Sequence, residues 1–127
     1  MKSACIYMEC PITKMVLAVS RKDDPNAWGL PGGKLEPGQD EVEAAREELK
    51  QETGIVLYAE WGGTCKPIEI YRRDDSVTFR VNPSWIFNIV DRAPGETGRV
   101  AWVHIEDLLN GPFSDYNRKL LKIIGRI

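Results

Sequence analysis

The chain has 127 residues, of which 43% are hydrophobic and 28% are charged, and its formal net charge is −2. This length suits a single domain, residues 1–127, built around one core, and the small net charge excludes a strong overall attraction to nucleic acid or to an anionic membrane. No apolar run approaches the roughly 20 residues that are needed to cross a bilayer.

The three cysteines, Cys5, Cys10 and Cys65, are odd in number and lack CxxC spacing. Such scattered thiols favour a reducing compartment over a disulfide framework, and together with a single histidine they argue against a zinc site. The first ten residues lack the long apolar stretch and small-residue cleavage site of a signal peptide. We therefore expect a cytoplasmic protein.

Two strands are predicted at the start of the chain. Residues 2–8 alternate apolar and polar side chains, and residues 14–20 are mostly apolar with β-branched members. Such runs are typical of strands, so residues 10–13 around Pro11 are predicted to form a hairpin turn. The segment KDDPNA at 22–27 is rich in turn-forming residues and is predicted to be a surface loop.

A glycine-rich turn followed by a helix is predicted next. Glycines in the segment PGGK, residues 31–34, allow positive φ and close approach of the backbone to a ligand. The helix is predicted to begin near Asp40, after the Pro37-Gly38 turn, and to end at Gly54, a favourable residue just past a helix C-terminus. Its buried side is expected to carry Val42, Ala45, Leu49 and Thr53.

Three carboxylates lie along one side of this helix. Glu41, Glu48 and Glu52 stand at i, i+7 and i+11, which places them within about 40° of each other around the helix axis. Stacked carboxylates repel each other, and a divalent cation would neutralise them. An ordinary solvated helix face is the alternative reading.

The remaining elements complete an α/β pattern. Strands are predicted at 55–61, 65–71, 77–81 and 85–90, with Pro83 separating the last two. A short strand at 100–103, a helical turn at 105–109 and an amphipathic helix at 115–124 with Ser114 as its N-cap follow. Strands on both sides of a central helix, together with a terminal helix, predict a sheet sandwiched between helices.

Residues 28–55, WGLPGGKLEPGQDEVEAAREELKQETGI, resemble the Nudix box. That pattern is Gly, five residues, Glu, seven residues, then Arg-Glu-aliphatic-x-Glu-Glu-x-Gly-aliphatic, and a spaced match of this length is specific. The resemblance implies the Nudix α/β/α sandwich around a mixed β-sheet. The matching residues are Gly33, Glu48, Leu49, Glu52, Gly54 and Ile55. The departures are Gln39 and Gln51, where the pattern has Glu, and Glu47, where it has Arg.

The resemblance also implies a site for Mg²⁺ or Mn²⁺. Glu48 and Glu52 would hold the cation, with the carbonyl of Gly33 as a further ligand, and Mg²⁺ needs few carboxylates because it keeps several waters. We hypothesise that Glu47 partly replaces the carboxylate that is missing at position 51. Glu96, in a later loop, is either an additional ligand or general base, or an ordinary loop acid.

Substrate contacts are predicted at four positions. Lys34, Arg21 and Arg80 could contact phosphate, since a polyanion needs nearby positive charge. An ordinary surface position is the favoured alternative for Arg21 and Arg80, whereas Lys34 belongs to the motif's lead-in. Asn117 resembles the base-reading asparagine of MutT-type members, and its paired donor and acceptor suit a purine edge.

Two functions follow from the resemblance. The first is a divalent-metal-dependent hydrolase of nucleoside diphosphate-linked substrates, foremost a nucleoside triphosphate pyrophosphohydrolase that releases a monophosphate and pyrophosphate. The second is a non-catalytic or weakly active Nudix domain that binds a nucleotide or nucleotide-sugar as a sensor or interaction module. The expected partner in both cases is a nucleotide or other nucleoside diphosphate derivative, without membrane or strong nucleic-acid binding. Both a monomer and a homodimer remain open.

Overall fold

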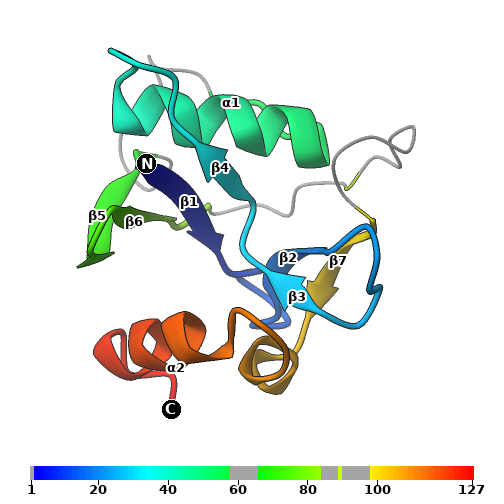
Figure 1. Cartoon of the computed structure of the whole chain (residues 1–127). Coiled ribbons are helices and arrows are strands. Elements are labelled where there is room, and N and C mark those ends of the chain that lie inside the picture. Colours follow the sequence, from blue (N-terminus) through cyan, green and yellow to red (C-terminus); the bar gives the residue numbers. More distant parts are fainter. Residues whose placement is uncertain (1, 58–65, 84–88, 90–97) are drawn as a thin grey trace.

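Two β-sheets lie between two helices in the computed structural model, which describes residues 2–57, 66–83, 89 and 98–127 (Figure 1). In chain order the elements are β1 (Ser3–Met8), β2 (Val16–Ser20), β3 (Trp28–Gly29), β4 (Gly32–Lys34), α1 (Glu41–Thr53), β5 (Ile68–Arg73), β6 (Ser76–Val81), β7 (Val100–Val103), the 3₁₀ helix η2 (Ile105–Leu109) and α2 (Ser114–Ile123).

The larger sheet is mixed. Its strand order is β4-β1-β6-β5, in which β1 and β6 run parallel while β4 and β5 are antiparallel to their neighbours. The parallel pair places Ser3 opposite Ser76 and Tyr7 opposite Arg80. The smaller sheet has the order β3-β2-β7 and is antiparallel throughout.

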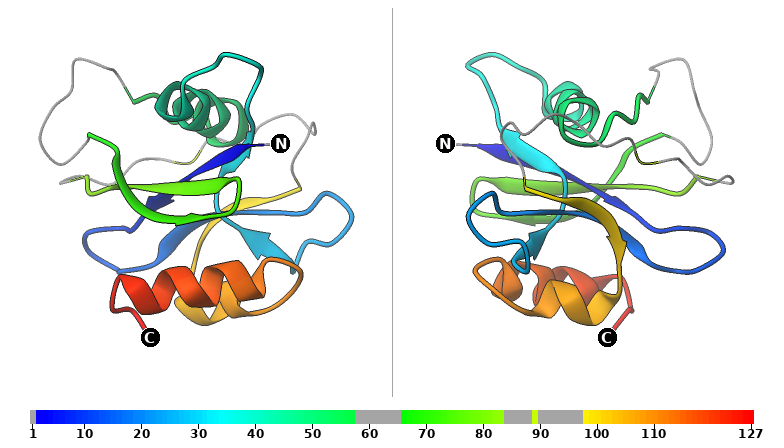
Figure 2. Two further views of the ribbon diagram at one scale, coloured as in Figure 1. Left: turned by 60° about the vertical axis from the view of Figure 1, so that its left-hand side comes forward. Right: turned by 90° about the vertical axis from the view of Figure 1, so that its right-hand side faces the viewer.

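The helices cover opposite sides of these sheets. Helix α1 packs against β1, β4 and β6, whereas α2 packs against η2 and β5. Figure 2 shows the sheets as a central layer with α1 on one side and α2 on the other. The predicted α/β/α arrangement around a mixed sheet is therefore confirmed. Among the residues that the structure describes, no helix is long and apolar enough to cross a membrane.

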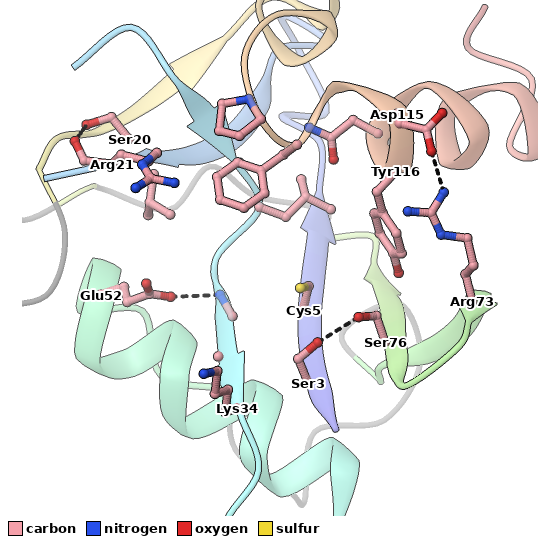
Figure 3. Close-up of a pocket in the computed structure, with 18 residues that line it drawn as sticks. Ser3, Cys5, Ser20, Arg21, Lys34, Glu52, Arg73, Ser76, Asp115 and Tyr116 are labelled. Carbon is pink, nitrogen blue, oxygen red and sulfur yellow. Dashed lines mark hydrogen bonds and ion pairs between the residues drawn. The ribbon is translucent and has the colours of Figure 1, made fainter. Parts of the chain in front are cut away.

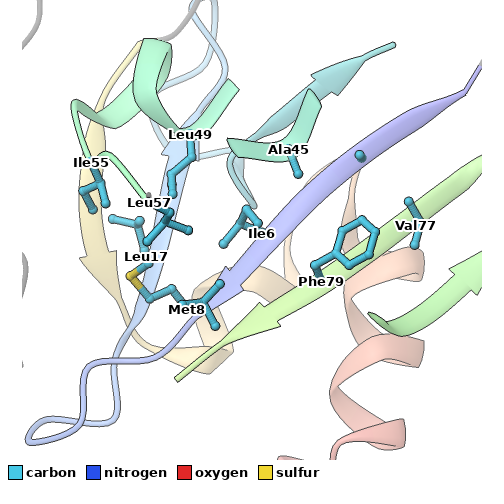
Figure 4. Packing of buried hydrophobic residues seen from close by; sticks show 11 residues of the cluster. Ile6, Met8, Leu17, Ala45, Leu49, Ile55, Leu57, Val77 and Phe79 are labelled. Atoms are coloured by element: carbon cyan, nitrogen blue, oxygen red, sulfur yellow. The ribbon is translucent and has the colours of Figure 1, made fainter. Parts of the chain in front are cut away.

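Alternation along the strands separates two apolar clusters. Ala4, Ile6 and Met8 of β1 belong to one cluster together with Leu49 of α1, and Figure 4 shows Ile6, Met8 and Leu49 within it. Tyr7, between them in sequence, belongs to the cluster on the α2 side, as the period-2 geometry of a strand requires. Buried residues of the first cluster also include Leu17, Ala45, Ile55, Leu57, Val77, Phe79 and Val81.

Local capping fixes both ends of α1, as predicted. The Asp40 side chain accepts a hydrogen bond from the backbone N–H of Glu43 at 3.1 Å, and a side-chain cap of this kind satisfies an otherwise unpaired helix donor. Gly54 ends the helix with φ of 81° and donates its N–H to the Lys50 carbonyl. Leu49 and Thr53 are fully buried, and Val42 is partly buried against the core.

Several other predicted elements are confirmed, with small differences in their first and last residues. The strands at 2–8, 14–20, 77–81 and 100–103 correspond to β1, β2, β6 and β7, and the helical turn at 105–109 is η2. The strand predicted at 65–71 is β5, which begins at Ile68. The turn at 10–13 is closed by the Lys14 N–H, which donates to the Cys10 carbonyl at 2.9 Å.

Three predictions about local structure were wrong. Residues 31–34 do not form a turn, because Gly32–Lys34 is strand β4 and neither of its glycines has positive φ. Ser114 is the first residue of α2 instead of its N-cap, since the chain has already turned at Gly111 (φ 85°). Residues 55–57 lie outside any strand. The rest of the strand predicted at 55–61, and all but residue 89 of that at 85–90, lie outside the described residues.

Candidate functional site

A cavity of about 500 Å³ opens between the sheets and the start of α2. Figure 3 shows Glu52, Arg21 and Lys34 on one side of it and Arg73, Asp115 and Tyr116 on the other, with Cys5 of β1 between them. The cavity is large enough for a small organic ligand.

The two glycines of β4 permit close packing on both faces of the strand. A Cβ on Gly32 would collide with the Ala4 carbonyl oxygen and lie 2.7 Å from Cys5 Sγ. A Cβ on Gly33 would lie 2.6 Å from Glu48 Cδ. Glycine therefore allows this close approach, since a side chain at Gly32 would meet the backbone of β1 and a side chain at Gly33 would displace the end of the Glu48 side chain.

Helix α1 supplies two carboxylates to this strand. Glu52 is only 9% exposed and lines the cavity, and its Oε1 accepts a hydrogen bond from the Gly32 backbone N–H at 2.7 Å (Figure 3). The carboxylate of Glu48 lies against Gly33. Residues four apart share a helix face, so both acids meet β4 at adjacent residues.

The thiol of Cys5 responds to these two charges. Burial, together with the negative charges of Glu52 and Glu48, raises the pKa of Cys5 to about 12. The two carboxylates therefore add negative charge near Cys5, and negative charge attracts a cation.

The donor set suits a hydrated divalent cation. Within the described part of the chain, no group of three or more His, Cys, Asp or Glu is arranged to hold a metal ion. Glu48 and Glu52 remain as a pair, and Mg²⁺ is commonly held by one or two carboxylates while it retains waters and substrate phosphate oxygens. The space that a side chain would fill at Gly33 is occupied by the Glu48 carboxylate, which keeps this acid beside the strand's carbonyl groups.

Glu47 does not join this pair. Its side chain is exposed, and its Oε2 accepts a hydrogen bond from Gln39 Nε2 at 3.1 Å. Consecutive helix residues diverge by about 100° around the axis, which accounts for the separation of Glu47 from Glu48. Gln51 is also exposed. Glu96, the other predicted catalytic acid, lies outside the described residues.

Three of the four predicted substrate contacts line the cavity. Lys34 and Arg21 are both exposed there, and Arg21 forms an ion pair with Asp23 at 3.0 Å. Asn117 is buried, and its Nδ2 donates to the Leu108 carbonyl at 3.0 Å. That bond uses one of the two N–H donors of the Asn117 amide.

The structure does not bring Arg80 to the cavity. Its guanidinium lies over the Tyr7 ring, 5.2 Å from the centroid, and its Nε donates to Asn82. Ser76, which lines the cavity, shares a strand face with Arg80. Four residues of a strand span about 13 Å, however, so Arg80 lies too far along β6 to contribute.

The wall formed by β5, β6 and α2 was not predicted as a site. Arg73 Nη1 donates to Asp115 Oδ2 at 2.7 Å, and the guanidinium lies 5.3 Å from the centroid of the Tyr116 ring. The Tyr116 hydroxyl hydrogen-bonds Thr78 Oγ1 at 2.8 Å. No sequence spacing indicates the Arg73–Asp115 pair, because its members lie on separate elements.

The fold is shared with solved structures of low sequence identity. The E. coli dihydroneopterin triphosphate pyrophosphohydrolase superposes with a TM-score of 0.70 at 23% identity, covering 97% of this chain and 94% of that one. The NUDIX domain of Shewanella oneidensis NrtR, solved with ADP ribose, gives a TM-score of 0.64 at 20% identity over 98% and 86% of the two chains.

Curated relatives match over a shorter segment. Nudix hydrolase 25 of Arabidopsis thaliana is 45% identical over 42 residues, which are 33% of this chain and 24% of that protein. The dihydroneopterin triphosphate diphosphatase of Escherichia coli K12 is 42% identical over 48 residues, 38% and 32% of the two chains. The matched segment thus spans about a quarter to a third of these proteins. The sequence model of the NUDIX domain matches residues 2–122, and the chain therefore belongs to the Nudix family.

Proposed function

We propose that this protein is a divalent-cation-dependent hydrolase of nucleoside diphosphate-linked substrates, and that it converts a nucleoside triphosphate to a monophosphate and pyrophosphate. The observation that carries the proposal is the position of Glu52. This buried carboxylate lines the cavity and is fixed by the Gly32 N–H at 2.7 Å. A fixed, buried acid beside a ligand-sized cavity is typical of a metal-assisted catalytic site.

Different residues would bind the cation and the phosphates during phosphoanhydride hydrolysis. Glu48 and Glu52 would hold Mg²⁺ or Mn²⁺, with the Gly33 carbonyl as an additional oxygen ligand. The bound cation would neutralise charge that develops on the phosphate oxygens and lower the pKa of a water that attacks phosphorus. Lys34 and Arg21, which line the same side of the cavity, would bind and orient the phosphates.

The names of relatives support a pyrophosphohydrolase. The E. coli K12 protein that matches over 48 residues is named a dihydroneopterin triphosphate diphosphatase. That match is confined to a segment of 48 residues. Because it covers only 32% of that protein, the choice of nucleotide is a matter for experiment.

A nucleotide-binding module without turnover is the second candidate. It is favoured by the amide at Gln51, which is neutral where the family pattern has a carboxylate, and by the exposed position of Glu47 away from Glu48. The NUDIX domain of S. oneidensis NrtR, whose fold is similar, was solved with ADP ribose. A module of this kind would bind its nucleotide without hydrolysing it.

Hydrolysis and binding measured together separate the two. Formation of the nucleoside monophosphate from nucleoside triphosphates and from ADP-ribose is followed with Mg²⁺, with Mn²⁺ and with EDTA, and binding of the same compounds is measured by calorimetry. The hydrolase requires cation-dependent turnover that Glu52→Gln lowers by about 100-fold or more, while the glutamine keeps the acceptor for the Gly32 N–H. Binding without turnover at high Mn²⁺ supports the module instead.

A further inference from the structure

The side of the cavity opposite Glu52 carries an ion pair with unused hydrogen-bonding capacity. Both contacts of the Asp115 carboxylate, to Arg73 Nη1 at 2.7 Å and to Lys119 Nζ at 3.8 Å, use Oδ2. Among the described residues, none hydrogen-bonds Oδ1. The guanidinium of Arg73 has five N–H donors, and the described residues accept a hydrogen bond from one of them.

This pair is held in place from two elements. Arg73 is the last residue of β5, and Asp115 is in the first turn of α2. The guanidinium also lies over the Tyr116 ring, which contacts the Tyr71 ring at 4.9 Å and hydrogen-bonds Thr78. The donors and acceptors of the pair therefore have a defined position before any ligand binds, which reduces the entropy cost of binding.

The carboxylate presents acceptors only. The hydrogen bond from Arg73 and the charge of Lys119 hold the pKa of Asp115 below its ordinary value. Near neutral pH the group is therefore ionised and selects ligands that offer N–H donors. The adjacent Arg73 offers only donors and selects an acceptor such as a carbonyl oxygen.

The cavity also has aromatic surface for a flat ligand. Phe113 lines the cavity, is 43% exposed, and packs close to Gly29, where a Cβ would lie 3.0 Å from Cδ2 of its ring. An exposed aromatic side chain near two oriented polar groups is suited to a planar heterocycle.

We infer that Asp115 and Arg73 recognise the edge of a heterocycle that carries a ring N–H and an amino group beside a carbonyl, as in guanine or a pterin. The N–H and amino donors face the Asp115 carboxylate, and the carbonyl oxygen accepts from Arg73. The inference rests on the proposed function, since it names the base of the same substrate, whose phosphates lie toward Glu52 and Lys34. Asn117 uses one N–H of its amide to bind the Leu108 carbonyl, so this contact is independent of the Arg73–Asp115 pair.

The test compares GTP with ITP, which lacks only the amino group. The wild-type protein should show kcat/KM about tenfold or more higher for GTP, as expected for a hydrogen bond to a charged group. Asp115→Asn should remove most of this preference, mainly through KM. Arg73→Gln should lower kcat/KM for GTP and for ITP by a similar factor. It should leave the hydrolysis of inorganic triphosphate unchanged. Asp74→Asn, with the same charge change in the β5–β6 turn, is the matched control and should retain the preference.

Equilibrium binding separates this inference from the proposed activity. Binding of GMP and IMP is measured with EDTA present. One outcome is that no substrate is hydrolysed, but GMP binds more tightly than IMP and Asp115→Asn abolishes the difference. The inference about base recognition is then supported, and the proposed hydrolase activity is rejected. Equal kcat/KM values for GTP and ITP in the wild-type protein overturn the inference that Asp115 and Arg73 recognise the base. So does an unchanged preference in Asp115→Asn, or a loss of triphosphate hydrolysis in Arg73→Gln, which would assign Arg73 to phosphate.

Discussion

Gln39 Nε2 donates a hydrogen bond to Glu47 Oε2 at 3.1 Å. These positions are two of the three at which the chain departs from the Nudix box, whose pattern has Glu and Arg there. A Glu and an Arg at these positions would place the acceptor in the loop and the donor on the helix, whereas here the donor comes from the loop and the acceptor from α1. Gln39 also accepts from the Glu36 N–H at 3.0 Å. The departures at Gln39 and Glu47 are therefore joined by a hydrogen bond, and Gln51 is not part of this contact.

Restoring only one member of this pair should destabilise the protein. Gln39→Glu removes the donor and places a second carboxylate beside Glu47, whereas the double variant with Glu47→Arg recreates an ion pair. In a double-mutant cycle followed by urea unfolding, we expect a favourable coupling free energy of about 0.5–1 kcal/mol, typical of an exposed pair. Additive effects of the two substitutions would show that the 3.1 Å contact contributes nothing.

Alanine at the two glycines of β4 should have different consequences. The Cβ of Gly32→Ala meets the backbone of Ala4, which cannot move aside, so we expect a loss of about 1–3 kcal/mol in the free energy of unfolding. The Cβ of Gly33→Ala meets the end of the flexible Glu48 side chain, so the fold should tolerate it while the displaced carboxylate weakens cation binding and hydrolysis. Thermal unfolding and cation titration of both variants measure this contrast. Equal loss of stability in both would contradict it.

Gln51→Glu should strengthen cation binding. The exposed amide lies next to Glu52 and three residues after Glu48 on α1, so a carboxylate there adds an anionic oxygen ligand on the same side of the helix. We expect the Mg²⁺ concentration for half-maximal hydrolysis to fall several-fold. Lys50→Gln makes the same net-charge change at the adjacent exposed residue and should leave that concentration unchanged. A matching shift in both variants would indicate a general charge effect.

Much of the fold was predictable because its signals are local. Asp40 and Gly54 cap α1 through contacts within a few residues, and the alternation in β1 reports which side chains face α1. The strand character of the PGGK segment was not predictable, because it follows from the approach of Ala4 and Glu48 in three dimensions. Glu52 could be identified from its helix spacing. The Arg73–Asp115 pair could not, since 42 residues separate its members.

The ion pair that joins α1 to β5 should make stability depend on pH in the acid range. Arg72 donates to both oxygens of Glu41, at 2.8 and 3.0 Å, and these hydrogen bonds lower the pKa of Glu41 below its ordinary value of 4.5. Folding therefore favours the ionised carboxylate. Its contribution to stability is fully present above pH 4.5 and is lost as the pH falls through the lower pKa of the folded state.

Glu41→Gln should accordingly be less stable than the wild-type protein at pH 7, and the difference should shrink as the pH is lowered below about 4.5, where the wild-type carboxylate becomes protonated. Urea unfolding at a series of pH values measures this convergence. Glu43→Gln is the matched control, because Glu43 lies in the same first turn of α1 and forms no ion pair within the described part of the chain. A stability difference for Glu41→Gln that is constant from pH 7 to pH 3 would mean that the Arg72 contact stabilises the fold by packing and not by charge.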